Sequence, residues 1–146
     1  MELNKRKKLL TVISLIIFSF LVTTAAPVHA TTGSVYLKRY KNLEKQCKKL
    51  FKYDGSQQEM NQESAKEYKL WDKELNYVYK EIYSKLTPNQ QKKLKKSELE
   101  WIKARDKKAK KSASEFEGGT MYPLIYNETL INLTKKRIKW LIKNYG

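Results

Sequence analysis

The stretch that decides the fold runs from residue 56 to residue 86 and reads SQQEMNQESAKEYKLWDKELNYVYKEIYSKL. Ser56 followed by Glu59 forms a capping box, in which each side chain accepts a hydrogen bond from the other residue's backbone N–H at the start of a helix. Apolar or small side chains then recur every three or four residues, at positions 60, 64, 68, 71, 75, 78, 82 and 86. Because this is the spacing of one face of an α-helix, the stretch predicts a long, one-sided helix.

Three further helices are predicted around this stretch. Apolar residues at 36, 40, 43, 47 and 50 keep the same rhythm on its N-terminal side, before the turn residues Asp54-Gly55-Ser56. Thr87-Pro88-Asn89-Gln90 predicts the start of a third helix, which runs to about residue 114. Gly118-Gly119-Thr120 predicts a break, and a last helix follows Pro123.

No segment alternates apolar and polar residues as a strand does. We therefore expect an all-α fold, a small bundle of about four helices, antiparallel where the connections are short and preceded by a signal-peptide helix. Residues 31–34, Thr-Thr-Gly-Ser, are expected to form a short linker before the first helix of the bundle.

The first thirty residues have the layout of a secretory signal peptide. A basic cluster at 5–8 precedes an uncharged apolar run over 9–26, and Val28-His29-Ala30 places small or modest side chains where signal peptidase cuts. We expect cleavage after Ala30, a single helical domain over 31–146, and a secreted or extracytoplasmic location in the cell envelope. The alternative is a retained membrane anchor, since the apolar run approaches the roughly 20 residues that span a bilayer.

Removing this segment changes the chemistry that remains. The chain has 31 basic and 15 acidic residues, and residues 31–146 keep 27 and 14 of them, a net charge of +13. The single histidine, His29, is lost, and with it Ser-His or Cys-His catalysis and the commonest metal ligand. Cys47 is the only cysteine and cannot form an intramolecular disulfide. We therefore expect no enzyme, no catalytic residues, no cofactor and no metal site.

The third predicted helix is strongly cationic. Two interpretations of its lysines are open: a solvated face that keeps the protein soluble, which is the simpler one, or a face that binds anionic wall polymers or lipid headgroups. Nucleic acid is not an expected partner of an exported protein, and we expect contact with a membrane only through an uncleaved signal. The candidate residues for polyanion binding are Lys92, Lys93, Lys95, Lys96, Lys103, Lys107, Lys108, Lys110 and Lys111.

One segment reverses this charge pattern. From residue 112 to residue 134 there is no Lys or Arg, and three glutamates stand among aromatic residues around the predicted glycine break. This acidic, aromatic loop is a candidate site for a cationic partner. The alternative is that the aromatic rings only pack the loop onto the helices and that the acids offset nearby lysines. The candidate residues are Glu115, Phe116, Glu117, Tyr122, Tyr126 and Glu128.

Several residues taken together resemble a known family, the LprI-type lysozyme inhibitor domain. The resemblance covers about residues 56–142. It implies a small exported or lipid-anchored helical protein that binds lysozyme or another wall hydrolase without catalysis. The residues that carry it are Met60-Asn61, Tyr68, Asp72, Leu75-Asn76, Tyr79, Trp101, Arg105-Asp106, Gly118-Gly119-Thr120, Leu133-Thr134 and Arg137.

The chain departs from the family pattern at its cysteines. Members commonly have cysteines at places where this chain has Glu63, Ala109 and Thr129, so the usual disulfides are absent. Cys47 is then free for intermolecular pairing or, as we favour, for burial as a small apolar side chain.

We expect the polar residues of the resemblance to have structural roles. Trp101 and Arg105 are four residues apart, which allows the guanidinium to stack on the indole, and Asp106 is expected to pair with Arg137. The spacing of Asp72, Asn76 and Tyr79 places them on one helix face. The alternative, that Asp72 and Asp106 act as acid and base in glycoside hydrolysis, requires them to approach each other.

Overall fold

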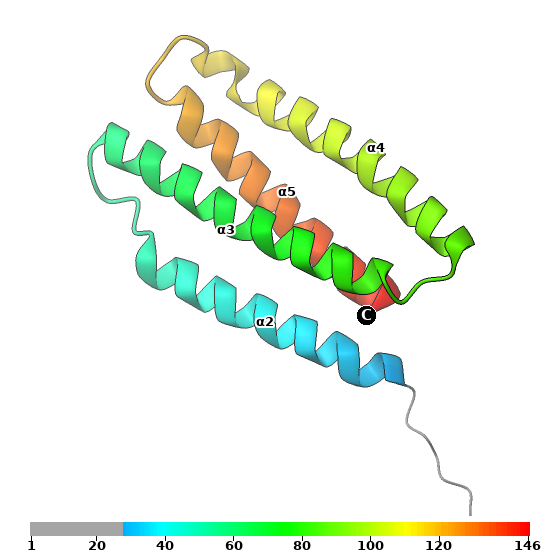
Figure 1. The fold of residues 1–146 in the computed structure, drawn as a ribbon. Coiled ribbons are helices and arrows are strands. Elements are labelled where there is room, and N and C mark those ends of the chain that lie inside the picture. The colour runs from blue at the N-terminus through cyan, green and yellow to red at the C-terminus, as the bar shows by residue number, and fades with distance from the viewer. Residues whose placement is uncertain (1–27) are drawn as a thin grey trace, which may run out of the picture.

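The computed structural model describes residues 28–146, with side chains from residue 33 onward, and this part of the chain is helical without strands. Figure 1 shows the helices, which are α2 (Val28–Leu50), α3 (Gln57–Tyr83), α4 (Pro88–Ala113), the short 3-10 helix η1 (Ser114–Phe116) and α5 (Tyr122–Tyr145). The predicted all-α bundle of four helices is confirmed. The predicted signal peptide falls almost wholly on residues 1–27, which lie outside the described part.

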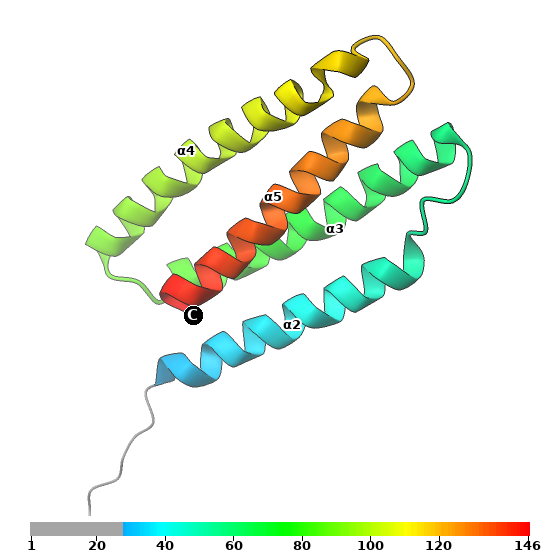
Figure 2. The ribbon, with the colours of Figure 1, turned by 180° about the vertical axis from the view of Figure 1, so that it is seen from behind.

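The bundle is built on a central pair of helices. α3 and α5 form the most extensive contact of the fold, and α2 and α4 flank this pair on opposite sides (Figures 1 and 2). Consecutive helices run antiparallel, as the short connections predict, so α3 and α5 run in the same direction. No helix within residues 28–146 combines the length and the apolar content that crossing a bilayer requires.

Both predicted capping boxes are present. Ser56 donates its backbone N–H to Glu59 Oε2 (2.8 Å), and Glu59 donates its own to Ser56 Oγ (3.4 Å). Thr87 and Gln90 make the same reciprocal pair before α4. These caps satisfy backbone donors that the first turn of a helix leaves without intrahelical partners, which is why α3 and α4 begin where they do.

The predicted stripe of α3 forms the middle of the core. Ser64, Trp71, Leu75, Val78 and Ile82 are buried, while the other stripe residues, Met60, Tyr68 and Leu86, are only partly covered. The other helices contribute further buried side chains to the same core. They are Tyr36, Tyr40 and Cys47 of α2, Leu94 of α4, and Ile131, Ile138 and Leu141 of α5. The favoured burial of Cys47 is thus confirmed.

The prediction of a linker over residues 31–34 is wrong, because these residues belong to the first turns of α2. The reason is a tertiary contact. A Cβ atom on Gly33 would lie 3.0 Å from the backbone carbon of Gly146, so the start of α2 packs closely against the end of α5. Glycine permits that approach, and the helix continues through a segment whose composition alone suggested a loop.

The α2–α3 connection is held by two carboxylates of α3. Tyr53 has a left-handed backbone with φ of 56°, which costs a residue with a Cβ roughly 1–2 kcal/mol. Its N–H donates to Glu63 Oε2 and its hydroxyl to Glu67 Oε2, both at 2.8 Å. Glu67 also accepts from the indole N–H of the core residue Trp71 (3.0 Å). Glu63 therefore ties this connection to α3 by a hydrogen bond.

Candidate functional site

Two buried arginines flank Trp101 where α4 meets its neighbours. The guanidinium carbons of Arg105 and Arg137 lie 5.1 Å and 5.5 Å from the Trp101 ring centroid, within the range of cation–π attraction. Each arginine is only 8% exposed. The expected stacking of Arg105 on Trp101 is confirmed, and Arg137 shares the same ring and also lies over Trp140 at 4.2 Å.

Arg105 brings two aspartates to one guanidinium. Its Nε donates to Asp106 Oδ1 (2.8 Å), and its Nη1 lies 3.5 Å from Asp72 Oδ1 on α3. Burial pulls the pKa of Arg105 down, but the hydrogen bond to Asp106 and the charges of Tyr68, Asp106 and Asp72 outweigh burial, so the pKa is raised. The guanidinium therefore stays charged and links α3 to α4.

The predicted pair of Asp106 with Arg137 is wrong. Arg137 donates to Glu98 (2.9 Å) and to Ser97 (3.0 Å), while Asp106 is bound by Arg105. The register of two antiparallel helices explains the difference. Residue 98 of α4 lies level with residue 137 of α5, and residue 106 is eight residues further along, about 12 Å away along the axis.

Four polar residues that carry the family resemblance line one groove between α3 and α4. This groove has a volume of about 380 Å³, and Asp72, Asn76 and Tyr79 lie along its α3 side with Arg105 opposite. Asn76 donates to the Asp72 backbone oxygen (2.8 Å) and to its carboxylate (3.1 Å), which fixes the orientation of both side chains. The single helix face that their spacing predicted is the wall of this groove. The remaining lining residues are Leu75, Lys95, Glu98, Leu99 and Ile102.

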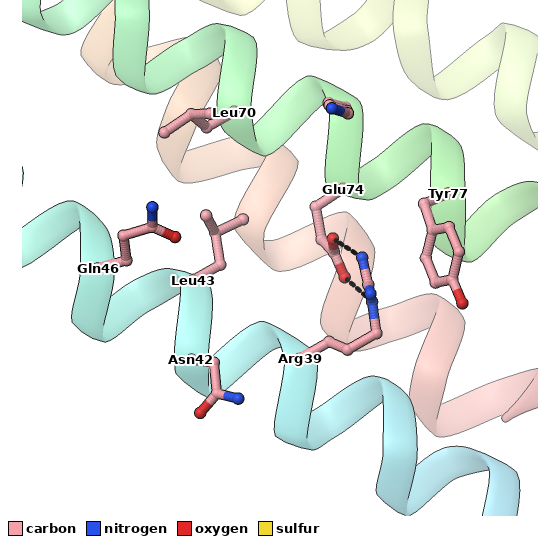
Figure 3. A pocket seen from close by; sticks show the side chains of 8 residues that line it. Arg39, Asn42, Leu43, Gln46, Leu70, Glu74 and Tyr77 are labelled. Carbon is pink, nitrogen blue, oxygen red and sulfur yellow. Dashed lines mark hydrogen bonds and ion pairs between the residues drawn. The ribbon is translucent and has the colours of Figure 1, made fainter.

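A second groove, of about 350 Å³, lies between α2 and α3 (Figure 3). At its edge Arg39 makes two hydrogen bonds to Glu74, of 3.0 Å and 2.8 Å, and its guanidinium carbon lies 3.9 Å from the centroid of the Tyr77 ring. This pair was not predicted from the sequence. The two partners are 35 residues apart, and no local spacing signals such a contact.

The predicted acidic loop separates into exposed carboxylates and partly buried rings. Glu115, Glu117 and Glu128 are exposed, whereas Phe116 is half-buried. The rings of Tyr122 and Tyr126 are also half-buried and stack with centroids 6.0 Å apart. Burial, followed by the nearby Asp106, raises the pKa of Tyr126. The rings are therefore partly covered, whereas the three carboxylates are open to solvent.

The fold brings further acidic residues to the same end of the bundle as this loop. Asn61 of α3 donates to the Thr120 backbone oxygen (2.9 Å), and Asn127 of α5 donates to Ser64 Oγ (3.0 Å). The α2–α3 and α4–α5 connections consequently lie at the same end of the bundle, as Figure 1 shows. Residues 53–65, like residues 112–134, contain no Lys or Arg. We name the carboxylates of these two stretches the acidic pole, which consists of Asp54, Glu59, Glu63, Glu115, Glu117 and Glu128.

The lysines of α4 face solvent. All nine candidate residues for polyanion binding are exposed. Among the described residues, the one ion pair that involves them is Lys96 with Glu100, at 3.9 Å. Most of the positive charge of α4 is thus left without a nearby anion.

Within residues 28–146 no group of three or more His, Cys, Asp or Glu side chains is placed to hold a metal ion.

No curated protein and no solved structure matches this chain significantly. A protein-family model does match, described as lysozyme inhibitor LprI, over residues 38–141. The match begins within α2, earlier than the start near residue 56 expected from the sequence, and so includes every helix of the bundle. The chain therefore belongs to the LprI lysozyme inhibitor family.

Proposed function

We propose that this protein is exported to the cell envelope and binds a lysozyme at its acidic pole, inhibiting that enzyme without any catalysis of its own. The observation that carries the proposal is the pairing of the family match over residues 38–141 with an anionic end on a cationic molecule. Lysozyme inhibition is a binding function, so a small helical domain needs only a suitable surface to perform it.

Charge favours the acidic pole over the rest of the surface. Common animal lysozymes are strongly cationic, and residues 31–146 carry a net charge of +13. Like charges slow diffusional encounter, whereas complementary patches steer it. The acidic pole has six carboxylates and no Lys or Arg in its two stretches. It is the part of the described surface where a cationic enzyme meets the least repulsion.

The pole is also held in place before any partner arrives. The bond from Asn61 to Thr120 ties the α4–α5 connection to α3. A surface that is ordered in the free protein loses less entropy on binding, which raises the affinity for a given set of contacts.

The arrangement of Asp72 and Asp106 supports the non-catalytic part of the proposal. Both carboxylates are paired with the buried Arg105 guanidinium, which gives them a structural role between α3 and α4. The matching test replaces both residues with Asn. If the natural protein degrades cell wall and this variant does not, the non-catalytic proposal fails.

Export rests on the sequence of residues 1–30. The test is to express the full chain with its N-terminus unaltered and to determine the mass of the protein in the medium or envelope fraction. We expect a chain that begins at Thr31. An intact precursor folded in the cytosol would overturn export.

Lysozyme binding is tested with two charge reversals of equal size. Glu115→Lys with Glu117→Lys alters the pole, and Glu81→Lys with Glu100→Lys makes the same change in net charge on α3 and α4 away from it. The readouts are the Kd for lysozyme and the residual wall-degrading activity of that enzyme, each at low and high salt. We expect the pole variant to bind at least about 10-fold more weakly and the control to bind within about threefold of the natural protein. Equal losses in both variants would disprove the pole as the site, and no inhibition by the natural protein would disprove the function.

A further inference from the structure

The three acids of α4 do little to offset its exposed lysines. Glu98 is 8% exposed and bound by Arg137, whereas the Asp106 side chain is 47% exposed and bound by Arg105. Glu100 is exposed and makes a long contact of 3.9 Å with Lys96. The two buried arginines therefore pair with two of the three acids, and most of the lysines of α4 are left without an ion-pair partner on their own helix.

Five of the exposed lysines form a straight stripe. With 3.6 residues per turn, they fall within about 60° of one another around the helix axis, and they span about 27 Å along it. The stripe lies opposite the face that carries Leu94, Trp101 and Arg105, so it points directly away from the bundle. The lysine stripe consists of Lys92, Lys96, Lys103, Lys107 and Lys110.

We infer that the lysine stripe is a docking surface for a linear polyphosphodiester of the cell envelope, of the poly(glycerol phosphate) kind. Successive lysines of the stripe are three to seven residues apart, about 4–10 Å along the axis, so each ammonium group can reach a different phosphate of an extended chain. Lysine binds phosphate as a mobile point charge, which suits a flexible polymer better than one fixed geometry.

The geometry favours a linear polymer over a membrane surface. Helices that bind bilayers present an apolar face to the acyl chains beside their basic residues. The apolar residues of α4 face its neighbours in the bundle, and Leu99 is its one exposed large apolar side chain. A narrow row of charges with almost no apolar flank matches a strand of phosphates.

The choice of an envelope polymer over nucleic acid rests on the proposed export, whereas the binding chemistry does not depend on lysozyme inhibition. Binding through α4 would hold the inhibitor on the wall that lysozyme attacks and would leave the acidic pole free for the enzyme.

The test compares two variants with the same loss of charge. The first changes the five lysines of the stripe to Gln. The second changes five exposed lysines of α2, on the opposite side of the bundle, to Gln, namely Lys38, Lys41, Lys45, Lys48 and Lys49. Gln and Lys have similar helix propensities, so both variants are expected to stay folded, and circular dichroism and urea unfolding check this.

The probe is delipidated poly(glycerol phosphate), and its affinity is measured by titration calorimetry over a series of salt concentrations. If five phosphates are contacted, the affinity of the natural protein should fall roughly 100-fold between about 50 mM and about 200 mM salt, by analogy with single-stranded nucleic acid. The stripe variant should lose most of this salt dependence, and the α2 variant should keep it. Equal losses in the two variants would replace the stripe with a diffuse cationic surface and overturn the inference.

Two further experiments identify the partner and separate this inference from the proposed function. Tighter binding to phosphatidylglycerol vesicles or to single-stranded DNA of equal total charge would overturn the assignment to an envelope polymer. The stripe variant should still inhibit lysozyme in solution, and the Glu115→Lys/Glu117→Lys variant should still bind the polymer. Loss of both activities in the stripe variant, with its fold intact, would contradict two separate surfaces.

Discussion

The two flanking helices, α2 and α4, are both rich in lysine, yet they are attached to the central pair by different chemistry. α2 buries Tyr36, Tyr40 and Cys47, so its attachment is mainly apolar. α4 buries Leu94 and two alanines, and it depends on Arg105 and Glu98 for the rest. A helix with few buried apolar residues can therefore keep a defined position if its buried charges are paired across the interface.

Buried ion pairs do not necessarily add net stability, because removing two charges from water costs free energy that their attraction has to offset. They do make the interface intolerant of losing one partner. The following predictions use this asymmetry to test the contrast between the two helices.

The largest effect is expected from Glu98→Ala. This change leaves Arg137 buried without its carboxylate, which should lower the free energy of unfolding by about 3–5 kcal/mol. Urea unfolding followed by circular dichroism measures it, with Glu100→Ala on the outer side of α4 as the control, expected within about 0.5 kcal/mol of the natural protein. A loss below about 1 kcal/mol for Glu98→Ala would show that the ion pair does not fix α4.

Alkaline pH should weaken the attachment of α2 instead. Burial raises the pKa of the Cys47 thiol to about 11, with a smaller contribution from Glu67, and burial raises the pKa of Tyr40 to about 12. A raised pKa means that the folded state keeps the proton longer than the unfolded state. The Cys47 contribution is therefore fully present below about pH 9 and is lost as the pH rises to about 11, a change on the order of 2 kcal/mol.

Urea unfolding measured from about pH 8 to about pH 11 tests this decline, and Cys47→Ala should reduce it. The same variant should leave unchanged the effect of Glu98→Ala at neutral pH, because α4 buries no thiol. An identical pH dependence with and without Cys47 would contradict the prediction.

A smaller effect is expected at the polar contact of α2. Glu74→Ala removes the carboxylate that binds Arg39, but 44% of the Arg39 side chain is exposed, so the guanidinium can turn to water. We expect a loss of about 1 kcal/mol in the free energy of unfolding. If Glu74→Ala costs as much as Glu98→Ala in the same urea experiment, the proposed contrast between the two helices disappears.

The smallest effect, of opposite sign, is expected from Thr134→Val. Within the described residues, Thr134 Oγ1 is buried without a hydrogen-bond partner, unlike the paired carboxylates Glu98 and Glu74. Replacing the hydroxyl with a methyl group removes that desolvation cost, which should raise the free energy of unfolding by up to about 1 kcal/mol. A destabilised variant in thermal or urea unfolding would show that the hydroxyl has a structural role in this member of the family.

Most of the secondary structure was predictable because its signals are local. The pairs Ser56 with Glu59 and Thr87 with Gln90 mark helix starts within four residues, and the stripe of α3 identifies its buried side. The stacking of Arg105 on Trp101 followed from the same spacing. Residues 31–34 were mispredicted as a linker from their composition, and their close approach to residue 146 is a contact that no local signal reveals.

The candidate sites divide in the same way. The exposed lysines of α4 and the glutamates near residues 115–128 were found from composition along the chain. The extension of the acidic pole to Asp54, Glu59 and Glu63 was not predicted. It depends on the bond from Asn61 to Thr120, which joins residues 59 apart in the sequence. The assignment of Arg137 to Asp106 failed because it requires the register of α4 against α5.

Neighbouring residues and simple counts are enough to predict the helices of the bundle, their approximate ends, the excess of positive charge and the absence of disulfides. They do not reveal which charges are buried in pairs and which remain on the surface. Packing sets the register of one helix against another, and a shift of eight residues along α4 changes the partner of Arg137 from Asp106 to Glu98.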